Sequence, residues 1–186
     1  MGRWQPDARG RLIRAAMELF AERGYDRTTA GDIAERAGVT ERTFFRHFPD
    51  KREVLFDGSA TLQKLAYEQI VQTPADASPL DAALAGMVAA GRLLESRPRD
   101  FAVSRAALIA GNPSLHEREL LKLAALAATT ADALRVRGVA EPAASLAAHS
   151  AVTVFAVAFE RWIAADDPPH YATCIADVAE ALRTLT

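Results

Sequence analysis

The sequence predicts an all-α protein in which an N-terminal three-helix head is followed by a C-terminal helical bundle, with about nine helices in total. Apolar residues recur three and four positions apart along most of the chain, and no stretch alternates apolar and polar residues as a half-buried strand would. Glycine, proline and capping residues divide this pattern into helix-sized segments. The 186 residues, 50% hydrophobic and 25% charged, are typical of a globular chain with one large domain or two small ones.

The first helix of the head is predicted from about Asp7 to Arg23, where Gly24 ends it. Tyr25 is expected to fill the core of this small head. The buried stripe of the helix consists of apolar residues at helical spacing, namely Leu12, Ala16, Leu19 and Phe20.

Two short helices joined by a tight turn are predicted next, between residues 28 and 48. Thr29 is a good N-cap with Asp32 as its capping partner, and Gly38 supplies the positive φ that the turn needs. Thr40 caps the following helix, on which Phe44 and Phe48 share one face because they are four residues apart. This face is expected to pack on the first helix, which makes the segment a helix-turn-helix.

The opposite face of the second short helix is expected to point outward. A step of about 100° per residue turns five side chains away from the core: Arg42, Thr43, Phe45, Arg46 and His47. A DNA major groove offers guanine and phosphate acceptors for arginine and thymine methyl groups for apolar side chains. The pattern therefore predicts a DNA-binding surface.

The pattern AAxxLFxxxGYDxTTxxDIAxxAGVTxxTFFxHFxxK, from about Leu12 to Leu55, closely resembles the tetracycline-repressor-like (TetR) regulators. The resemblance implies that Thr28 or Thr29 and Thr40 meet phosphate, in addition to capping their helices. Its remaining DNA-contacting positions divide into base readers, Arg42 and Thr43, and phosphate contacts, Arg46, His47 and Lys51. Phe45 stands where the family usually has tyrosine, so one hydroxyl contact is lost while the ring contact is kept.

The domain scheme that follows is a helix-turn-helix DNA-binding domain at 1–52 and a ligand-binding and dimerisation domain at 53–186. The second domain is expected to begin with a helix from just after Asp50 to about Val71, and a loop follows at 72–79. The remaining helices are predicted near 79–95, 99–110, 113–137, 142–165 and 168–186, with starts and ends at proline and glycine.

The last two predicted helices are expected to form a symmetric homodimer, as in the family. The helix near 142–165 is apolar nearly all the way round, which indicates burial on every side. The residues expected at the dimer interface are Val154, Trp162, Ile175, Val178 and Leu182. The alternative is that these side chains form only the internal core of one chain.

The resemblance also implies a pocket for a small-molecule effector within the bundle. The residues expected to line it are mostly apolar, which favours a hydrophobic ligand: Met87, Phe101, Arg105, Leu108, Leu126, His149, Phe155 and Phe159. For the apolar residues the alternative is plain core. His149 is either a satisfied core or interface histidine or a polar contact in the pocket, and Arg105 either meets an anionic group or is solvated.

Charge and composition restrict the other function classes. Residues 1–52 hold 11 Arg and Lys against 8 Asp and Glu, an excess of +3, whereas 53–186 hold 11 against 16, or −5. The basic end therefore lies on the head, as DNA binding requires. A single cysteine, an N-terminus without an apolar signal segment, and a stretch at 143–158 judged too polar to span a membrane predict a cytoplasmic protein. Neither a catalytic motif nor a metal-ligand spacing is present, so no enzyme, cofactor or metal is expected.

Together these observations predict a transcriptional repressor that a small, mostly hydrophobic molecule releases from a palindromic double-stranded DNA operator. The alternative is a helical ligand-binding or interaction protein whose head binds no specific site.

Overall fold

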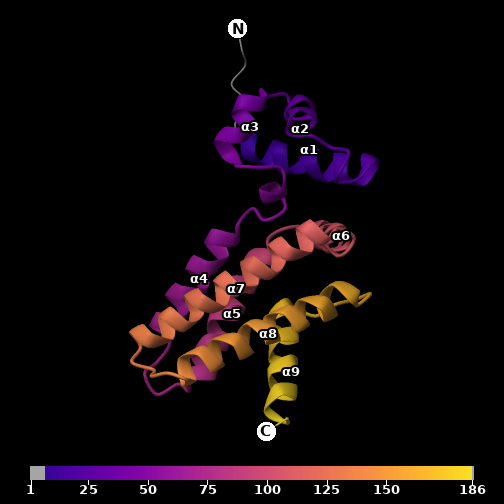
Figure 1. Cartoon of the computed structure of the whole chain (residues 1–186). Coiled ribbons are helices and arrows are strands. Elements are labelled where there is room, and N and C mark those ends of the chain that lie inside the picture. The colour runs from indigo at the N-terminus through magenta and orange to yellow at the C-terminus, as the bar shows by residue number, and fades with distance from the viewer. Residues whose placement is uncertain (1–6, 186) are drawn as a thin grey trace. The chain divides into compact units, whose positions relative to one another are not determined.

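The structure is a computed structural model that describes residues 7–185, and it is all-helical over that range (Figure 1). The predicted all-α class is confirmed. Within the described residues there are nine α-helices and one 3-10 helix, η1, and no strand. In chain order they are α1 (Ala8–Arg23), α2 (Ala30–Arg36), α3 (Glu41–His47), η1 (Arg52–Val54), α4 (Ser59–Gln72), α5 (Pro79–Glu95), α6 (Arg99–Ala110), α7 (Pro113–Val136), α8 (Ala143–Ala164) and α9 (Tyr171–Arg183).

The chain divides into two compact units, and the division differs from the predicted scheme. Unit 1 holds the chain up to Asp57 together with Ser104–Glu117, which are the second half of α6 and the start of α7. Unit 2 holds Gly58–Val103 and Arg118–Thr186. Residues 1–6 of the predicted first domain lie outside the described range. A boundary drawn at a single point in the sequence cannot represent a unit built from two separate segments.

The corner between α6 and α7 is held in unit 1 by polar contacts of its own. Arg105 donates from Nε to the carbonyl oxygen of Leu55 at 2.6 Å, and its guanidinium lies 5.1 Å from the ring centroid of Phe56. Asn112 donates to the Asp26 carboxylate at 3.3 Å. Arg105 was predicted to line the effector pocket, and this prediction is wrong because its side chain is engaged in unit 1.

The helix predicted directly after Asp50 is interrupted. Asp50 does act as a cap, since its carboxylate accepts from the backbone N–H groups of Arg52 and Glu53, but these begin the short η1. Gly58 then takes a φ of +90°, and α4 begins only at Ser59. A left-handed residue cannot continue an α-helix, so the chain turns between η1 and α4.

Unit 2 is a bundle in which α4 packs on α5, and α5 packs on both α8 and α9. Its core includes the aromatic residues Phe155, Trp162 and Tyr171. Glycine permits the closest approaches, because a Cβ on Gly91 would lie 2.5 Å from Cδ1 of Tyr171, and one on Gly86 would lie 2.6 Å from Cγ1 of Ile70. Figure 1 shows α9 running at a steep angle to α8.

Helix α8 is the most apolar helix of the bundle. Contrary to the prediction from its stretch 143–158, its length and composition are those of a helix able to cross a membrane, a test that the core helices of soluble proteins also pass. Here α8 packs against α5 and α9. Packing within the chain therefore covers part of its apolar surface.

The residues predicted for the dimer interface lie mainly inside one chain. Val154, Trp162, Ile175 and Val178 are buried in the core of unit 2, and Leu182 packs partly buried against it. The internal-core alternative therefore holds for the first four. The apolar side chains that α8 does expose are Leu146, 64% exposed, and Val157, 40% exposed.

Candidate nucleic-acid interface

Helix α2 begins with a complete capping box. The Thr29 hydroxyl oxygen accepts from the Asp32 backbone N–H at 3.1 Å, and the Asp32 carboxylate accepts from the Thr29 backbone N–H at 2.8 Å. The Thr29 hydroxyl also donates to that carboxylate at 2.7 Å. These hydrogen bonds, first from the hydroxyl and then from the backbone of Thr29, lower the pKa of Asp32. The predicted cap is confirmed, and it occupies the groups of Thr29 that a phosphate would use.

The turn and the second cap follow the predicted pattern. Gly38 has a φ of +67°, and Thr40 accepts from the backbone N–H of Thr43 at 3.2 Å to start α3. The two hydroxyl oxygens of Thr40 and Thr43 lie 3.0 Å apart. Both threonines therefore fix the start of α3, and the Thr40 side chain remains exposed.

The inward face of α3 is aromatic. Phe44 and Phe48 are buried, with ring centroids 5.7 Å apart, and Ile33 of α2 is buried in the same unit. The guanidinium of Arg9 covers the Phe48 ring at 4.9 Å and pairs with Asp57. This packing fixes which side of α3 faces outward.

The outward face of α3 carries the side chains that the sequence predicts there. Arg42 and Arg46 are exposed, and within residues 7–185 neither has a hydrogen-bond or ion-pair partner. Phe45 is 51% exposed and meets the Phe44 ring edge-on at 5.4 Å. Two unengaged guanidinium groups one helical turn apart, together with an exposed phenyl ring on the same helix, give α3 a surface suited to a groove.

Thr28 is a correction to the predicted interface. Its side chain is fully buried, and its hydroxyl donates to the carbonyl oxygen of Gly24 at 2.9 Å, with that of Leu19 at 3.4 Å. The hydroxyl thus holds the end of α1 and is closed to a phosphate.

Lys51 is a second correction. Its ammonium group donates to the carbonyl oxygens of Tyr25 at 2.8 Å and Thr28 at 2.9 Å, with that of Asp26 at 3.5 Å. It also lies 4.2 Å from the centroid of the Tyr25 ring, whose pKa burial raises to about 12. Three acceptors take up the three N–H donors of a lysine, so Lys51 holds the loop between α1 and α2 where a phosphate contact was predicted.

His47 is only partly consistent with its predicted role. The ring is half-buried, and its Nε2 atom is buried without a hydrogen-bond partner among the described residues. A phosphate contact would have to use Nδ1 or a turned ring.

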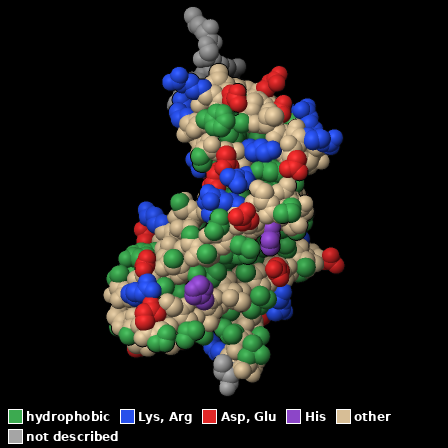
Figure 2. All heavy atoms as spheres, viewed as in Figure 1, with side chains coloured by type: hydrophobic (Ala, Val, Ile, Leu, Met, Phe, Trp, Pro, Cys, Tyr) green, Lys and Arg blue, Asp and Glu red, His purple; other side chains and the backbone are tan. Residues whose placement is uncertain are grey.

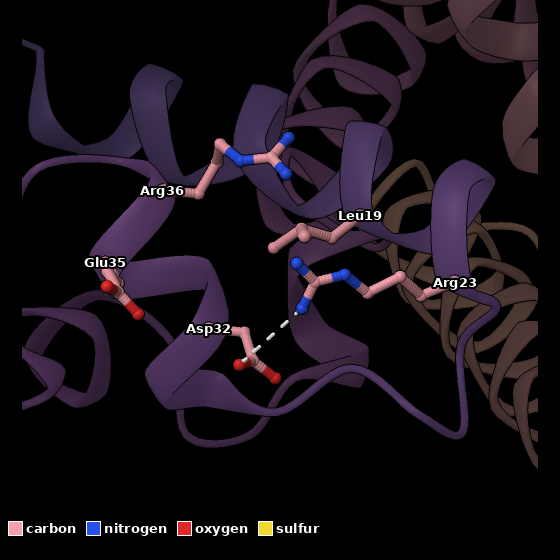
Figure 3. Close-up of a pocket in the computed structure, with 5 residues that line it drawn as sticks. All are labelled: Leu19, Arg23, Asp32, Glu35 and Arg36. Carbon is pink, nitrogen blue, oxygen red and sulfur yellow. Dashed lines mark ion pairs between the residues drawn. The ribbon is translucent and has the colours of Figure 1, made fainter.

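A small hollow lies between α1 and α2 in unit 1, with a volume of about 250 Å³ (Figure 3). Its lining mixes both signs of charge: Leu19, Arg23, Asp32, Glu35 and Arg36. Arg36 pairs with Glu22 at 2.8 Å and Glu18 at 3.3 Å, and the hydrogen bond from Arg36 lowers the pKa of Glu22. Because its cations are already paired, this hollow is a poor anion site. Figure 2 likewise shows acidic and basic side chains side by side on the visible face of this unit.

The residues predicted to line the effector pocket are dispersed. Met87, Leu126 and Phe155 are buried in the core of unit 2, and Phe159 packs partly buried against it. Phe101 is half-buried in unit 2, whereas Leu108, also half-buried, belongs to unit 1. His149 is exposed on α8, so it is neither a core histidine nor a polar contact in a pocket of this chain, and its predicted interface role stays a prediction.

One polar residue of the bundle core was missed by the sequence analysis. Thr130 of α7 is fully buried, and the residues on either side of it on the same helix face are buried and apolar. A threonine in the middle of a leucine and alanine stripe was the available signal. A separate groove of about 330 Å³ lies between α5 and α9, and no group of three or more potential metal ligands occurs in the described part of the chain.

Comparison with known proteins places these features in context. Residues 12–57 match the family described as "Bacterial regulatory proteins, tetR family". The HTH-type transcriptional regulator TcmR of Streptomyces glaucescens is 40% identical over 92 residues, which are 50% of this chain and 39% of TcmR. The match thus spans less than half of this relative.

Solved structures extend the likeness over nearly the whole chain. Thermus thermophilus FadR, a TetR-family repressor in complex with lauroyl-CoA, is 26% identical and has a TM-score of 0.53, with 94% of this chain and 93% of that chain covered. The SmeT–triclosan complex has a TM-score of 0.62 at 18% identity, with 94% and 90% covered, and this similarity concerns the fold alone.

Proposed function

We propose, on the premise that the chain belongs to the TetR family of transcriptional regulators, that it is a ligand-responsive repressor of the cytoplasm. It binds double-stranded DNA through α3 and leaves its operator when a small, mostly hydrophobic molecule enters the bundle. It is not an enzyme.

The observation that carries the DNA-binding proposal is the outward face of α3. Arg42, in the first turn of α3, is suited to a bidentate contact with guanine, and Phe45 to a thymine methyl group. Arg46, one turn further on, contacts phosphate. Thr40, Thr43 and His47 flank these side chains and complete the proposed interface, whereas the engaged Lys51 and the buried Thr28 are left out of it.

A homodimer is proposed because a single head has little positive charge to bind with, an excess of +3 in residues 1–52. Two heads related by a two-fold axis match a palindromic operator. The proposed interface uses the outward faces of α8 and α9, where Leu146 and Val157 are exposed. Leu146→Glu is expected to shift the protein toward monomer in analytical ultracentrifugation, and an unchanged dimer would place the interface elsewhere.

The proposed response to ligand is a population shift. An effector that binds one arrangement of the bundle better than the other favours that arrangement by its difference in affinity. The FadR and SmeT structures support a ligand role for this fold, since each is a complex with a small molecule.

The test is fluorescence polarisation with duplex DNA from upstream of the protein's own gene, at moderate salt, against random duplex. A specific site should bind about 10³-fold or more tightly than random DNA. Arg42→Ala should change which bases are preferred, whereas Arg46→Ala should weaken binding to all sequences and reduce the salt slope by about 1. Arg92→Ala, which removes the same charge from an exposed position on α5, serves as the control. No preference over random duplex would instead support a helical ligand-binding protein without a specific site.

A further inference from the structure

The core of unit 2 contains a polar side chain that lacks a partner. Thr130 is 0% exposed, and within residues 7–185 its Oγ1 atom has no hydrogen bond. Its neighbours on the inner face of α7 are all buried and apolar, namely Leu126, Ala127, Ala133 and Leu134. The hydroxyl is therefore buried on an apolar face of α7.

Other threonines of the chain show how such a hydroxyl is usually satisfied. Thr153 donates to the carbonyl oxygen of His149 at 2.9 Å, and Thr73 donates to that of Gln69 at 2.8 Å, in each case four residues earlier. Thr28, which is equally buried, is also bonded to the carbonyl four residues earlier. Thr130 makes no such bond. A buried hydroxyl left unpaired is costly and calls for an explanation.

The surroundings of Thr130 restrict what can pair with it. Thr28 and Thr130 are the fully buried polar residues of the described chain, and Thr28 lies in unit 1. Arg99 of unit 2 has a buried Nε atom without a partner among the described residues, but its side chain is only half-buried and its guanidinium donates to the carbonyl oxygens of Trp162 and Ile163. A charged ligand group in the core of unit 2 would therefore meet no fully buried counter-charge, and burying an unpaired charge is strongly unfavourable. A neutral oxygen, by contrast, needs only the one hydrogen bond.

The core can make room for a ligand mainly by moving helices. Of its 27 buried residues 14 are alanine, whose side chains have no rotamer to change. Met87, fully buried in the same core, has three rotatable bonds and can adapt its shape. Entry of a ligand is thus coupled to displacement of helices, as in a pocket that exists in a minor conformation.

We propose that Thr130 is the polar anchor of the effector site, and that the effector is a neutral, mostly apolar molecule with a carbonyl, ether or hydroxyl oxygen. This inference rests on the ligand-responsive function proposed above and specifies its ligand. The Thr130 hydroxyl donates to the ligand oxygen, while Met87, Leu126 and their apolar neighbours enclose the rest of the molecule.

The first experiment measures thermal stability without ligand. Thr130→Val keeps the shape and removes the hydroxyl, so its Tm should exceed that of the wild type by about 2–4 °C. Thr130→Ser keeps the hydroxyl and loses a methyl group, so its Tm should fall below that of the wild type. A Thr130→Val protein no more stable than the wild type would mean that the hydroxyl is already paired, for example by water, and would overturn the proposal.

The second experiment uses three probes of nearly the same shape. Acetophenone carries a carbonyl oxygen, α-methylstyrene replaces that oxygen by CH2, and benzoate carries a charge. Acetophenone should bind the wild type and Thr130→Ser about 10-fold more tightly than α-methylstyrene does. It should therefore raise the Tm of both proteins more than α-methylstyrene at the same concentration. In Thr130→Val the two should become equal. Benzoate should have no effect in any of the proteins.

Equal effects of acetophenone and α-methylstyrene on the wild type, or no effect of either, would contradict the anchor role, and stabilisation by benzoate alone would contradict the neutral ligand. These measurements need no DNA. If operator binding fails while Thr130 discriminates the probes, the repressor proposal fails alone. If operator binding succeeds and Thr130 does not discriminate, only the present inference fails.

Discussion

The two units of this protein use polar groups in different ways. In unit 1, Thr28 and Lys51 hold separate segments together through hydrogen bonds, and Asp32 closes the capping box that starts α2. In unit 2, bonds of this kind lie mainly outside the buried core, as where Arg137 donates to the carbonyl oxygens of Ile70 and Pro74. The core itself is mostly apolar, its helices approach closely at glycine and alanine, and it contains one hydroxyl without a partner among the described residues. Directional bonds fix a geometry, whereas apolar contacts permit sliding and repacking. The comparison indicates that unit 1 holds the outward face of α3 rigidly, whereas the interior of unit 2 can adapt its packing.

The largest expected effect tests the close packing of unit 2. Gly91→Ala places a Cβ 2.5 Å from the buried Tyr171 ring, and this overpacking should destabilise the protein by about 3 kcal/mol. Chemical denaturation measures the loss. Gly31→Ala is the control, because its nearest contact is at 3.6 Å and alanine favours a helix. A Gly91→Ala protein as stable as the wild type would show that unit 2 repacks even at its tightest point.

The second prediction tests the polar fixation of unit 1. Lys51→Met keeps much of the apolar stem but removes the bonds to the Tyr25 and Thr28 carbonyls, which should cost about 2 kcal/mol of stability. Because Lys51 is engaged within the protein, the salt slope of DNA binding should remain that of the wild type.

Lys51→Arg provides the matched charge-preserving variant. It should recover part of the lost stability if the acceptors of the loop can still be reached. A normal stability for Lys51→Met together with a salt slope reduced by about 1 would restore the phosphate contact that the sequence predicts.

The contrast between the units also explains what the sequence could predict. Local signals succeeded: the Thr29–Asp32 capping box, the left-handed Gly38 and the buried faces of Phe44 and Phe48 all depend on residues close in sequence. Failures arose where distant segments meet. The partner of Arg105 is Leu55, 50 residues away, and that of Lys51 is Tyr25, 26 residues away. Spacing along one helix contains no information about such contacts.

The bundle shows the same limit in another form. The apolar residues all round α8 predicted burial, which is observed for Val154 and Trp162. The pattern did not predict whether the residues packed against them come from the same chain or from a second copy. His149 was placed by its apolar neighbours in sequence, yet it faces solvent. When a helix is apolar on most sides, its sequence pattern does not show which face is buried, so its few polar residues cannot be assigned to the core or to the surface.

A third prediction concerns the part of unit 1 that is not fixed by polar bonds. Phe45→Tyr adds a hydroxyl at an exposed position, so stability should change little. The hydroxyl can donate to a phosphate, and operator affinity should rise about fivefold. Polarisation titrations measure it, with Phe45→Leu as the control that removes the ring and should weaken binding. Equal affinity of all three proteins would place Phe45 outside the DNA contact.

The smallest expected effect is a pH dependence of the capping box. The hydrogen bonds from Thr29 lower the pKa of Asp32 in the folded protein. The stability that Asp32 contributes is therefore complete above its unfolded pKa of about 4 and is lost as the pH falls through the lower folded value. Asp32→Asn cannot titrate, so its Tm should lie below that of the wild type at pH 7 and approach it as the pH falls below about 4. Thermal melts of both proteins from neutral to acidic pH measure this convergence, and a constant difference at all pH values would mean that the carboxylate charge has no part in holding α2.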